Sequence, residues 1–182
     1  CRSYILNSQA INMIEEKEDL MELGVNSFRV EFRDESKDEV SKLKDKEAKT
    51  IVLFTYATGE KCYSKEWWAA FYEDLKHTLP NYNIIEVLPV ENVSQLNFSI
   101  PSYYSKDVRE ICSFFANCDV FIGADSGIMH LATASGVPTL GLFSVTQPDT
   151  YQPYGNQSKG IDTKVTSNAK IIEEAKQILE SN

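Results

Sequence analysis

Unbroken apolar runs alternate with stretches of helical spacing from residue 50 onward. Such runs are typical of strands buried on both faces of a parallel sheet. The stretches between them carry apolar residues three or four positions apart, which predicts helices packed on that sheet. This alternation predicts an α/β fold with a parallel, doubly wound sheet and helices on both faces. The expected strands are 51–54, 84–88, 119–123 and 138–143, and the expected helices are 65–79, 105–117, 126–136 and 168–180.

The first 49 residues follow a less regular pattern. Residues 9–23 have roughly helical apolar spacing and stop at Gly24, which predicts a helix. Residues 27–33 alternate with period two, which predicts a half-buried strand. Residues 34–49 are dense in lysine, aspartate and glutamate, and we interpret them as a solvated helix or linker.

Composition narrows the classes of function. At 182 residues the chain is long enough for one well-cored domain and too short for two full α/β domains. Its net charge of −9 argues against a broad nucleic-acid-binding surface, because such surfaces depend on clustered lysine and arginine. No run approaches the ~18 consecutive apolar residues of a membrane span. A small anionic ligand remains possible, because backbone amides and one or two cations can hold a phosphate.

The cysteines and histidines form no metal-binding pattern. No Cys-x-x-Cys pair is present among four cysteines and two histidines, so no zinc site is predicted. We interpret the cysteines as reduced thiols of a cytoplasmic protein. No signal peptide is expected, and the start at Cys1 rather than Met leads us to expect that the sequence begins inside a longer chain. The four cysteines are Cys1, Cys62, Cys112 and Cys118.

The sharpest chemical signal follows the strand expected at 119–123. The sequence continues there with Ala-Asp-Ser-Gly-Ile-Met-His, and Asp125 or Ser126 is a good N-cap for the next helix. Gly127 lets a ligand approach the first turn, where free amides and the positive end of the helix dipole suit a diphosphate. His130 shares that helix face and can point at the same ligand. Taken alone, these residues are explained more simply by a helix cap and a partly buried histidine.

Two other loops follow strands of the same predicted sheet. Residues 55–61 offer hydroxyls, including that of Thr58, and the cation of Lys61 to phosphate oxygens. They do not form a P-loop, and a solvent-exposed lysine is the simpler explanation. The loop after the last strand carries Thr146 and is followed by residues 154–156, and their polar groups could line the same crevice. Turn chemistry alone would also explain Pro148 and Gly155. Ligands bind outside the carboxyl ends of strands in open α/β sheets, so these loops are expected to line one crevice.

Residues 118–143 resemble a known signature. The segment reads Cys-Asp-Val-Phe-Ile-Gly-Ala-Asp-Ser-Gly-Ile-Met-His-Leu-Ala and continues through Gly-Val-Pro to Leu-Phe. It is similar to the Asp-Ser/Thr-Gly-x-x-His-Leu signature of the heptosyltransferases of bacterial lipopolysaccharide synthesis (glycosyltransferase family nine). The Lys61 loop and the downstream Trp67 and Trp68 resemble the family's lysine loop and the helix after it. The resemblance covers about residues 50–160.

The resemblance implies one half of a GT-B glycosyltransferase, in which two Rossmann-like domains face each other. In that family the C-terminal domain binds the nucleotide-sugar donor and the N-terminal domain binds the acceptor. Residues 50–182 would then be the C-terminal nucleotide-sugar-binding domain, and residues 1–49 a connector and a remnant of the N-terminal domain. Since the family's catalytic base belongs to the N-terminal domain, the catalytic base is unknown here, and this fragment alone is expected to be inactive.

Carried over to this sequence, the resemblance also assigns a donor site. It implies that residues 125–127 contact the donor's sugar and diphosphate, with a histidine supporting them from the helix. The lysine would help to neutralise the phosphates as the nucleoside diphosphate departs, and an acidic residue after the second strand would accept from ribose hydroxyls. No metal or cofactor is implied. The expected donor-binding residues are Lys61, Asp125, Ser126, Gly127, His130, Thr58, Thr146 and Glu91.

The chain departs from the family after the last strand. The family usually has Gly-Pro-Thr-Asp-Pro there, whereas residues 144–148 read Ser-Val-Thr-Gln-Pro. The donor is therefore expected to be ADP-heptose or another nucleotide-diphosphate sugar. The expected acceptor is a glycolipid such as the lipopolysaccharide core, bound through the N-terminal domain of a protein that is cytoplasmic or peripheral to the inner membrane. Two alternatives stay open: a non-catalytic nucleotide-sugar-binding module, and a GT-B sugar-nucleotide epimerase.

Overall fold

The computed structural model describes residues 48–181. Its strands are β1 (Thr50–Phe54), β2 (Asn83–Val87), β3 (Ser102–Tyr103), β4 (Val120–Ala124), β5 (Thr139–Phe143) and β6 (Lys159–Asp162). They form one 6-stranded sheet in the order β3-β2-β1-β4-β5-β6, and every neighbouring pair is parallel. The predicted parallel α/β architecture is therefore confirmed, with the four expected strands as β1, β2, β4 and β5. The elements expected at 9–23, at 27–33 and in 34–47 lie outside the described residues.

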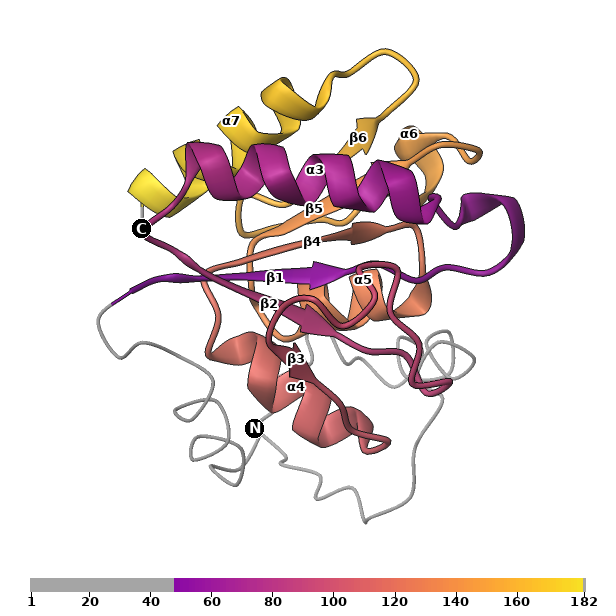
Figure 1. Ribbon diagram of the computed structural model, residues 1–182. Coiled ribbons are helices and arrows are strands. Elements are labelled where there is room, and N and C mark those ends of the chain that lie inside the picture. Colours follow the sequence, from indigo (N-terminus) through magenta and orange to yellow (C-terminus); the bar gives the residue numbers. More distant parts are fainter. Residues whose placement is uncertain (1–47, 182) are drawn as a thin grey trace, which may run out of the picture. The chain divides into compact units, whose positions relative to one another are not determined.

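Helices cover both faces of the sheet (Figure 1). Helices α3 (Lys65–Thr78) and α7 (Asn168–Ser181) pack on one face, and α4 (Val108–Ala116) and α5 (Gly127–Ala134) pack on the other. Alternate side chains of each strand supply the two cores, because successive residues of a strand point to opposite faces. In β1, for example, Ile51 and Leu53 join the first core, and Val52 and Phe54 join the second.

Helix α3 is fixed at both ends and along one side. Its N-cap residue is Ser64, whose Oγ accepts a hydrogen bond from the Trp67 amide at 3.2 Å. Trp68 and Phe71 are completely buried against the sheet, and the helix ends before Pro80. Trp67 is only half-buried and stacks on Phe71 with ring centroids 5.2 Å apart. None of the helices in this described part of the chain is long and apolar enough to cross a membrane.

Three short elements differ from the sequence-based expectation. The strand β3 has two residues, which is too short for a periodic signal. The edge strand β6 has one fully buried position, Ile161, so its apolar pattern is weak. Pro148 is not simply a turn residue: it begins the helix α6 (Pro148–Tyr151), because the first helical position needs no backbone N–H donor.

The cysteines of the described region form no disulfide, as predicted for Cys62, Cys112 and Cys118. Cys112 is on the buried side of α4, and this burial raises the pKa of its thiol to about 12. It therefore remains protonated at neutral pH and serves as a small apolar side chain of the core. Cys1 lies outside the described residues.

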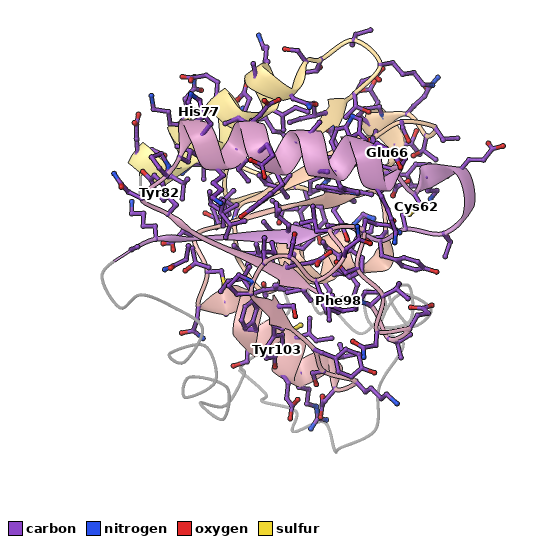
Figure 2. All side chains as sticks on the ribbon, in the orientation of Figure 1. Cys62, Glu66, His77, Tyr82, Phe98 and Tyr103 are labelled. Atoms are coloured by element: carbon purple, nitrogen blue, oxygen red, sulfur yellow. The ribbon has the colours of Figure 1, made fainter. Side chains whose placement is uncertain are left out.

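The order of the strands creates a switch point between β1 and β4. From β1 the chain proceeds through α3 to β2 on one side, and after β3 it crosses through α4 to β4 on the other side. Such a reversal leaves a crevice outside the carboxyl ends of the two strands, which is where open α/β sheets bind ligands. Figure 2 shows Cys62, shortly after β1, at this end of the molecule and His77, near the end of α3, at the opposite end.

Candidate functional site

The loops after β1 and β4 meet at the switch point. Lys61 follows β1 and Asp125 directly follows β4, and their side chains form an ion pair with Nζ and Oδ2 2.9 Å apart. Asp125 is 6% exposed, whereas 38% of the Lys61 side chain is exposed. The structure thus brings together two of the predicted site residues that are distant in sequence. Lys61 is not a free surface cation, the simpler explanation that its loop alone suggested.

A tight turn carries Lys61 to this position. The 3-10 helix η2 (Gly59–Lys61) begins after Thr58, which is exposed. Gly59 has a φ of +62°, a backbone conformation that glycine adopts without strain. Next to Lys61, the thiol of Cys62 accepts a hydrogen bond from Nε2 of Gln95 at 3.5 Å. The lysine loop is therefore linked to the segment that follows β2.

The amino terminus of α5 lies directly after Asp125. Ser126 is its N-cap, and its Oγ accepts from the amide of Met129 at 3.4 Å. Gly127 is exposed, and a Cβ at this position would meet no heavy atom within 4 Å. His130 lies on the same exposed side of α5, so it is not the partly buried histidine considered above. The free amides and the positive dipole end of the first turn can attract an anion beside the ion pair.

The loop after β5 reaches the same carboxylate. Oγ1 of Thr146 donates to Oδ2 of Asp125 at 2.6 Å. The same oxygen therefore accepts this hydrogen bond and forms the ion pair with Lys61. Residues 154–156 do not join them, contrary to expectation. The side-chain amide of Asn156 donates to the carbonyl of Gly136, which precedes β5. The turn lies there because it leads into β6, and the amino end of a parallel strand is at the opposite edge of the sheet.

A buried carboxylate on β2 escaped the sequence analysis. Glu86 is completely buried and accepts hydrogen bonds from Oγ1 of Thr55 and Oγ of Ser94, each at 2.6 Å. The Ser94 oxygen also accepts from two backbone amides of the following turn, which fixes the segment after β2 against the end of β1. Glu91, the expected ribose ligand, lies in the exposed part of that segment. A single acid within an apolar run carries no pattern that would have marked Glu86.

Tyr63 is the second residue that sequence reasoning missed. Its hydroxyl forms a hydrogen bond of 2.8 Å with Oγ1 of Thr163, which follows β6. Burial raises the pKa of Tyr63; the hydroxyls of Thr163 and Ser144 oppose that rise, and the carboxylates of Asp162 and Asp125 add to it. The phenol is therefore neutral at physiological pH and joins the loops after β1 and β6 beside the ion pair.

We expect Tyr63→Phe to lower the free energy of unfolding by about 1 kcal/mol, the typical net value of one hydrogen bond. Thr163→Val should cost more, because the Thr163 hydroxyl also donates to the carbonyl of Phe143 at 3.1 Å. Urea unfolding of the two single variants and the double variant checks this. If the two losses simply add up in the double variant, the hydroxyls are not coupled and the assignment is wrong.

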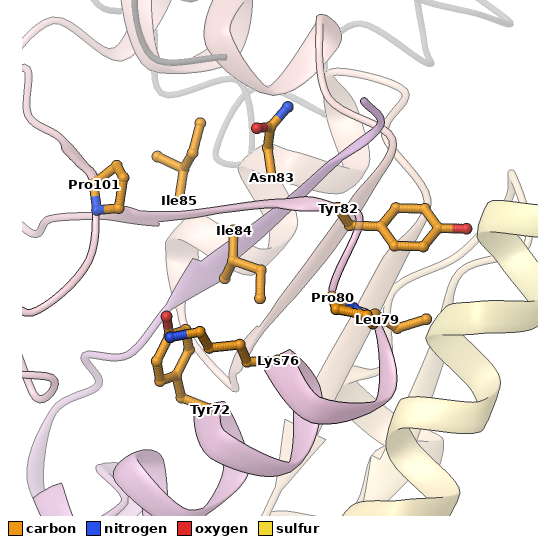
Figure 3. A pocket seen from close by; sticks show the side chains of 9 residues that line it. All are labelled: Tyr72, Lys76, Leu79, Pro80, Tyr82, Asn83, Ile84, Ile85 and Pro101. Carbon is orange, nitrogen blue, oxygen red and sulfur yellow. The ribbon is translucent and has the colours of Figure 1, made fainter. Parts of the chain in front are cut away.

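The structure also has a hollow at the opposite end of the sheet (Figure 3). It lies beside the end of α3 and the start of β2, has a volume of about 230 Å³, and is lined by Tyr72, Lys76, Leu79, Pro80, Tyr82, Asn83, Ile84, Ile85 and Pro101. Ligand pockets usually measure ~300–1,000 Å³ and in open α/β sheets lie at the carboxyl edge. The site at Lys61 and Asp125 is therefore the stronger candidate. Among residues 48–181 no group of three or more His, Cys, Asp or Glu side chains could hold a metal ion.

Comparison with known proteins relates part of this chain to glycosyltransferases. Residues 106–179 match the family model described as glycosyltransferase family 9 (heptosyltransferase). Lipooligosaccharide heptosyltransferase 2 of Campylobacter jejuni is 29% identical over 75 residues, which are 41% of this chain and 22% of that protein. This chain therefore spans only part of the length of its relatives.

Solved structures share the fold. The glycosyl transferase of family 9 from Veillonella parvula superimposes with a TM-score of 0.73 at 15% identity, over 98% of this chain and 63% of that one. The ADP-heptose lps heptosyltransferase II of E. coli superimposes with a TM-score of 0.67 at 15% identity, over 84% of this chain and 54% of that one. The matched segment carries β4, α5 and β5 with Asp125, Ser126 and Gly127. Residues 106–179 of this chain are thus similar to glycosyltransferase family 9, the heptosyltransferase family.

Proposed function

We propose that this chain supplies the nucleotide-sugar donor site of a glycosyltransferase that transfers a heptose or a related sugar. The observation that carries the proposal is the ion pair of Lys61 and Asp125 at the switch point of the sheet, directly before the amino terminus of α5. A cation, a set of free amides and a carboxylate lie together there. A diphosphate binds to a cation and to free amides, and the hydroxyls of a sugar can donate hydrogen bonds to a carboxylate.

In this assignment each part of the donor has a partner of matching chemistry. The diphosphate lies between Lys61 and the first turn of α5, where Gly127 leaves open space. The sugar lies toward Asp125, and Thr146 holds that carboxylate in place. His130 is exposed on the same side of α5 and would support the donor site from that helix. Thr58 and Glu91, both exposed on loops after β1 and β2, remain candidates for contacts with the phosphates and the ribose.

The relatives narrow the proposed substrates. One solved relative is named for ADP-heptose, and the curated relative is a lipooligosaccharide heptosyltransferase. We take ADP-heptose as the first candidate donor and a lipopolysaccharide-type glycolipid as the acceptor. Residues 50–182 would form the donor-binding domain and residues 1–49 a connector, in a protein that works in the cytoplasm or at the inner membrane. Transfer requires no metal or cofactor in this scheme.

Isothermal titration of the chain with ADP, GDP, UDP and ADP-heptose tests the proposal. We expect ADP and ADP-heptose to bind more tightly than GDP and UDP. A bound nucleotide should also raise the melting temperature, because a ligand specific for the native state stabilises it. No binding of any of the four would reject the donor site.

Gly127→Ala probes the space beside the first turn of α5. The added methyl group meets nothing within 4 Å in the structure, and alanine favours helix more than glycine, so the melting temperature should not fall. A diphosphate bound on the first-turn amides would meet that methyl group, so affinity for ADP should drop severalfold in titration. Unchanged affinity would place the phosphates elsewhere.

A further inference from the structure

We propose that Asp125 makes the site favour a sugar-bearing nucleotide over the bare nucleoside diphosphate, by competing with the terminal phosphate for Lys61. This inference rests on the proposed donor site. It gives the carboxylate a role in specificity and in product release in addition to its contact with the sugar.

The starting point is that Lys61 is already paired. Its Nζ is 2.9 Å from Oδ2 of Asp125, and the carboxylate is nearly buried. Thr146 donates to the same oxygen at 2.6 Å, so the carboxylate is held in position from a second loop. An incoming phosphate therefore meets a lysine whose charge is balanced by a fixed anion.

Geometry then forces the phosphate close to that anion. A phosphate oxygen bound to the ammonium at the distance seen for Asp125 cannot be more than about 6 Å from Oδ2, twice the ion-pair distance. Two negative groups at that separation repel each other, and the small exposure of Asp125 weakens screening by water and salt. The phosphate must either share Lys61 against this repulsion or displace Asp125 from it.

The two nucleotides differ in how they meet the carboxylate. The terminal phosphate of a bare nucleoside diphosphate carries one more ionisable oxygen than the same phosphate esterified to a sugar. Asp125 repels that additional negative charge. In the sugar nucleotide the charge is absent, and sugar hydroxyls can donate to the carboxylate instead. In transfer, the acceptor oxygen bonds to the sugar carbon and its proton passes to the base expected in the N-terminal domain. The bond between that carbon and the phosphate oxygen breaks, and its electron pair stays on the phosphate. The product then meets the repulsion that the donor avoided.

The test compares affinities of ADP and ADP-heptose for the wild-type chain and for Asp125→Asn, which keeps the size of the side chain and removes its charge. We expect affinity for ADP to rise on the order of tenfold, the effect of removing one like charge at this distance in a partly screened site. Affinity for ADP-heptose should stay unchanged or fall, so the preference shifts toward ADP. Asp125→Ala should shift the preference in the same direction, and it serves as a second variant if the first one folds poorly.

Glu73→Gln is the matched control, because it removes one negative charge from an exposed position of α3. It should leave both affinities unchanged, whereas an equal gain in ADP affinity would show that net charge alone is responsible and overturn the proposal. Unchanged or weaker ADP binding by both Asp125 variants, with normal binding by the wild type, would overturn this inference and leave the donor site intact. Failure of the wild type to bind either nucleotide would overturn the donor site and this inference together.

Discussion

Lys61→Ala should lower the affinity for ADP by about 10- to 100-fold, because a charge-assisted hydrogen bond to a ligand contributes ~1.5–3 kcal/mol. The lysine is the cation that pairs with Asp125 at the switch point, and its removal also leaves that carboxylate facing the phosphates without a counter-charge. Both effects weaken nucleotide binding. Raised salt should reduce ADP affinity of the wild type as well, since the lysine side chain is 38% exposed.

Lys65→Ala is the control for this variant. Lys65 is a nearby lysine at the start of α3, and its Nζ donates to Oδ1 of Asn97 at 2.8 Å instead of pairing with Asp125. Titration calorimetry at a temperature well below unfolding should show near-wild-type affinity for Lys65→Ala. Equal losses for the two variants would mean that general positive charge, and not the position of Lys61, attracts the nucleotide.

Trp68→Ala should lower the free energy of unfolding by about 3–5 kcal/mol, the usual cost of truncating a large buried aromatic side chain. Trp68 is completely buried between α3 and the sheet and contacts Phe71 edge-on, with ring centroids 5.8 Å apart. The truncation removes apolar contacts and leaves a cavity in a core that α3 and α7 share. Urea or thermal unfolding followed by circular dichroism measures the loss.

The neighbouring Trp67 provides the matched control. It is half-buried and packs on Tyr63 and Phe71 at the edge of the same core. Trp67→Ala removes the same number of atoms but less buried area, so it should destabilise the protein by roughly half as much or less. If Trp67→Ala costs as much as Trp68→Ala, the core is arranged differently from the structure described above.

Most of the sheet could be predicted from the sequence, because strands buried on both faces leave apolar runs that are hard to mistake. Thus β1, β2, β4 and β5 were expected within one or two residues of their observed bounds. The strands at the two edges of the sheet were missed for the opposite reason. β3 has only two residues, and β6 has one fully buried position, so neither produces a clear period.

The candidate site could be predicted only in part. Asp125 and Ser126 stand out because a strand end, a helix cap and a glycine follow one another in sequence. For Lys61, the sequence predicted only that its loop lines the crevice. The ion pair with Asp125 could not be predicted, because it depends on which strands become neighbours in the sheet. The contributions of Glu86 and Tyr63 could not be predicted at all. Their partners come from other loops, and the residue types alone fit an ordinary core equally well.

A crystal structure of the chain with ADP is the most direct test of the central claim, that the diphosphate binds at the switch point between β1 and β4. The account predicts phosphate oxygens within hydrogen-bonding distance of Nζ of Lys61 and of the first-turn amides of α5. ADP bound instead in the hollow lined by Tyr72 and Lys76 at the opposite end of the sheet, with Lys61 still paired only to Asp125, would contradict it.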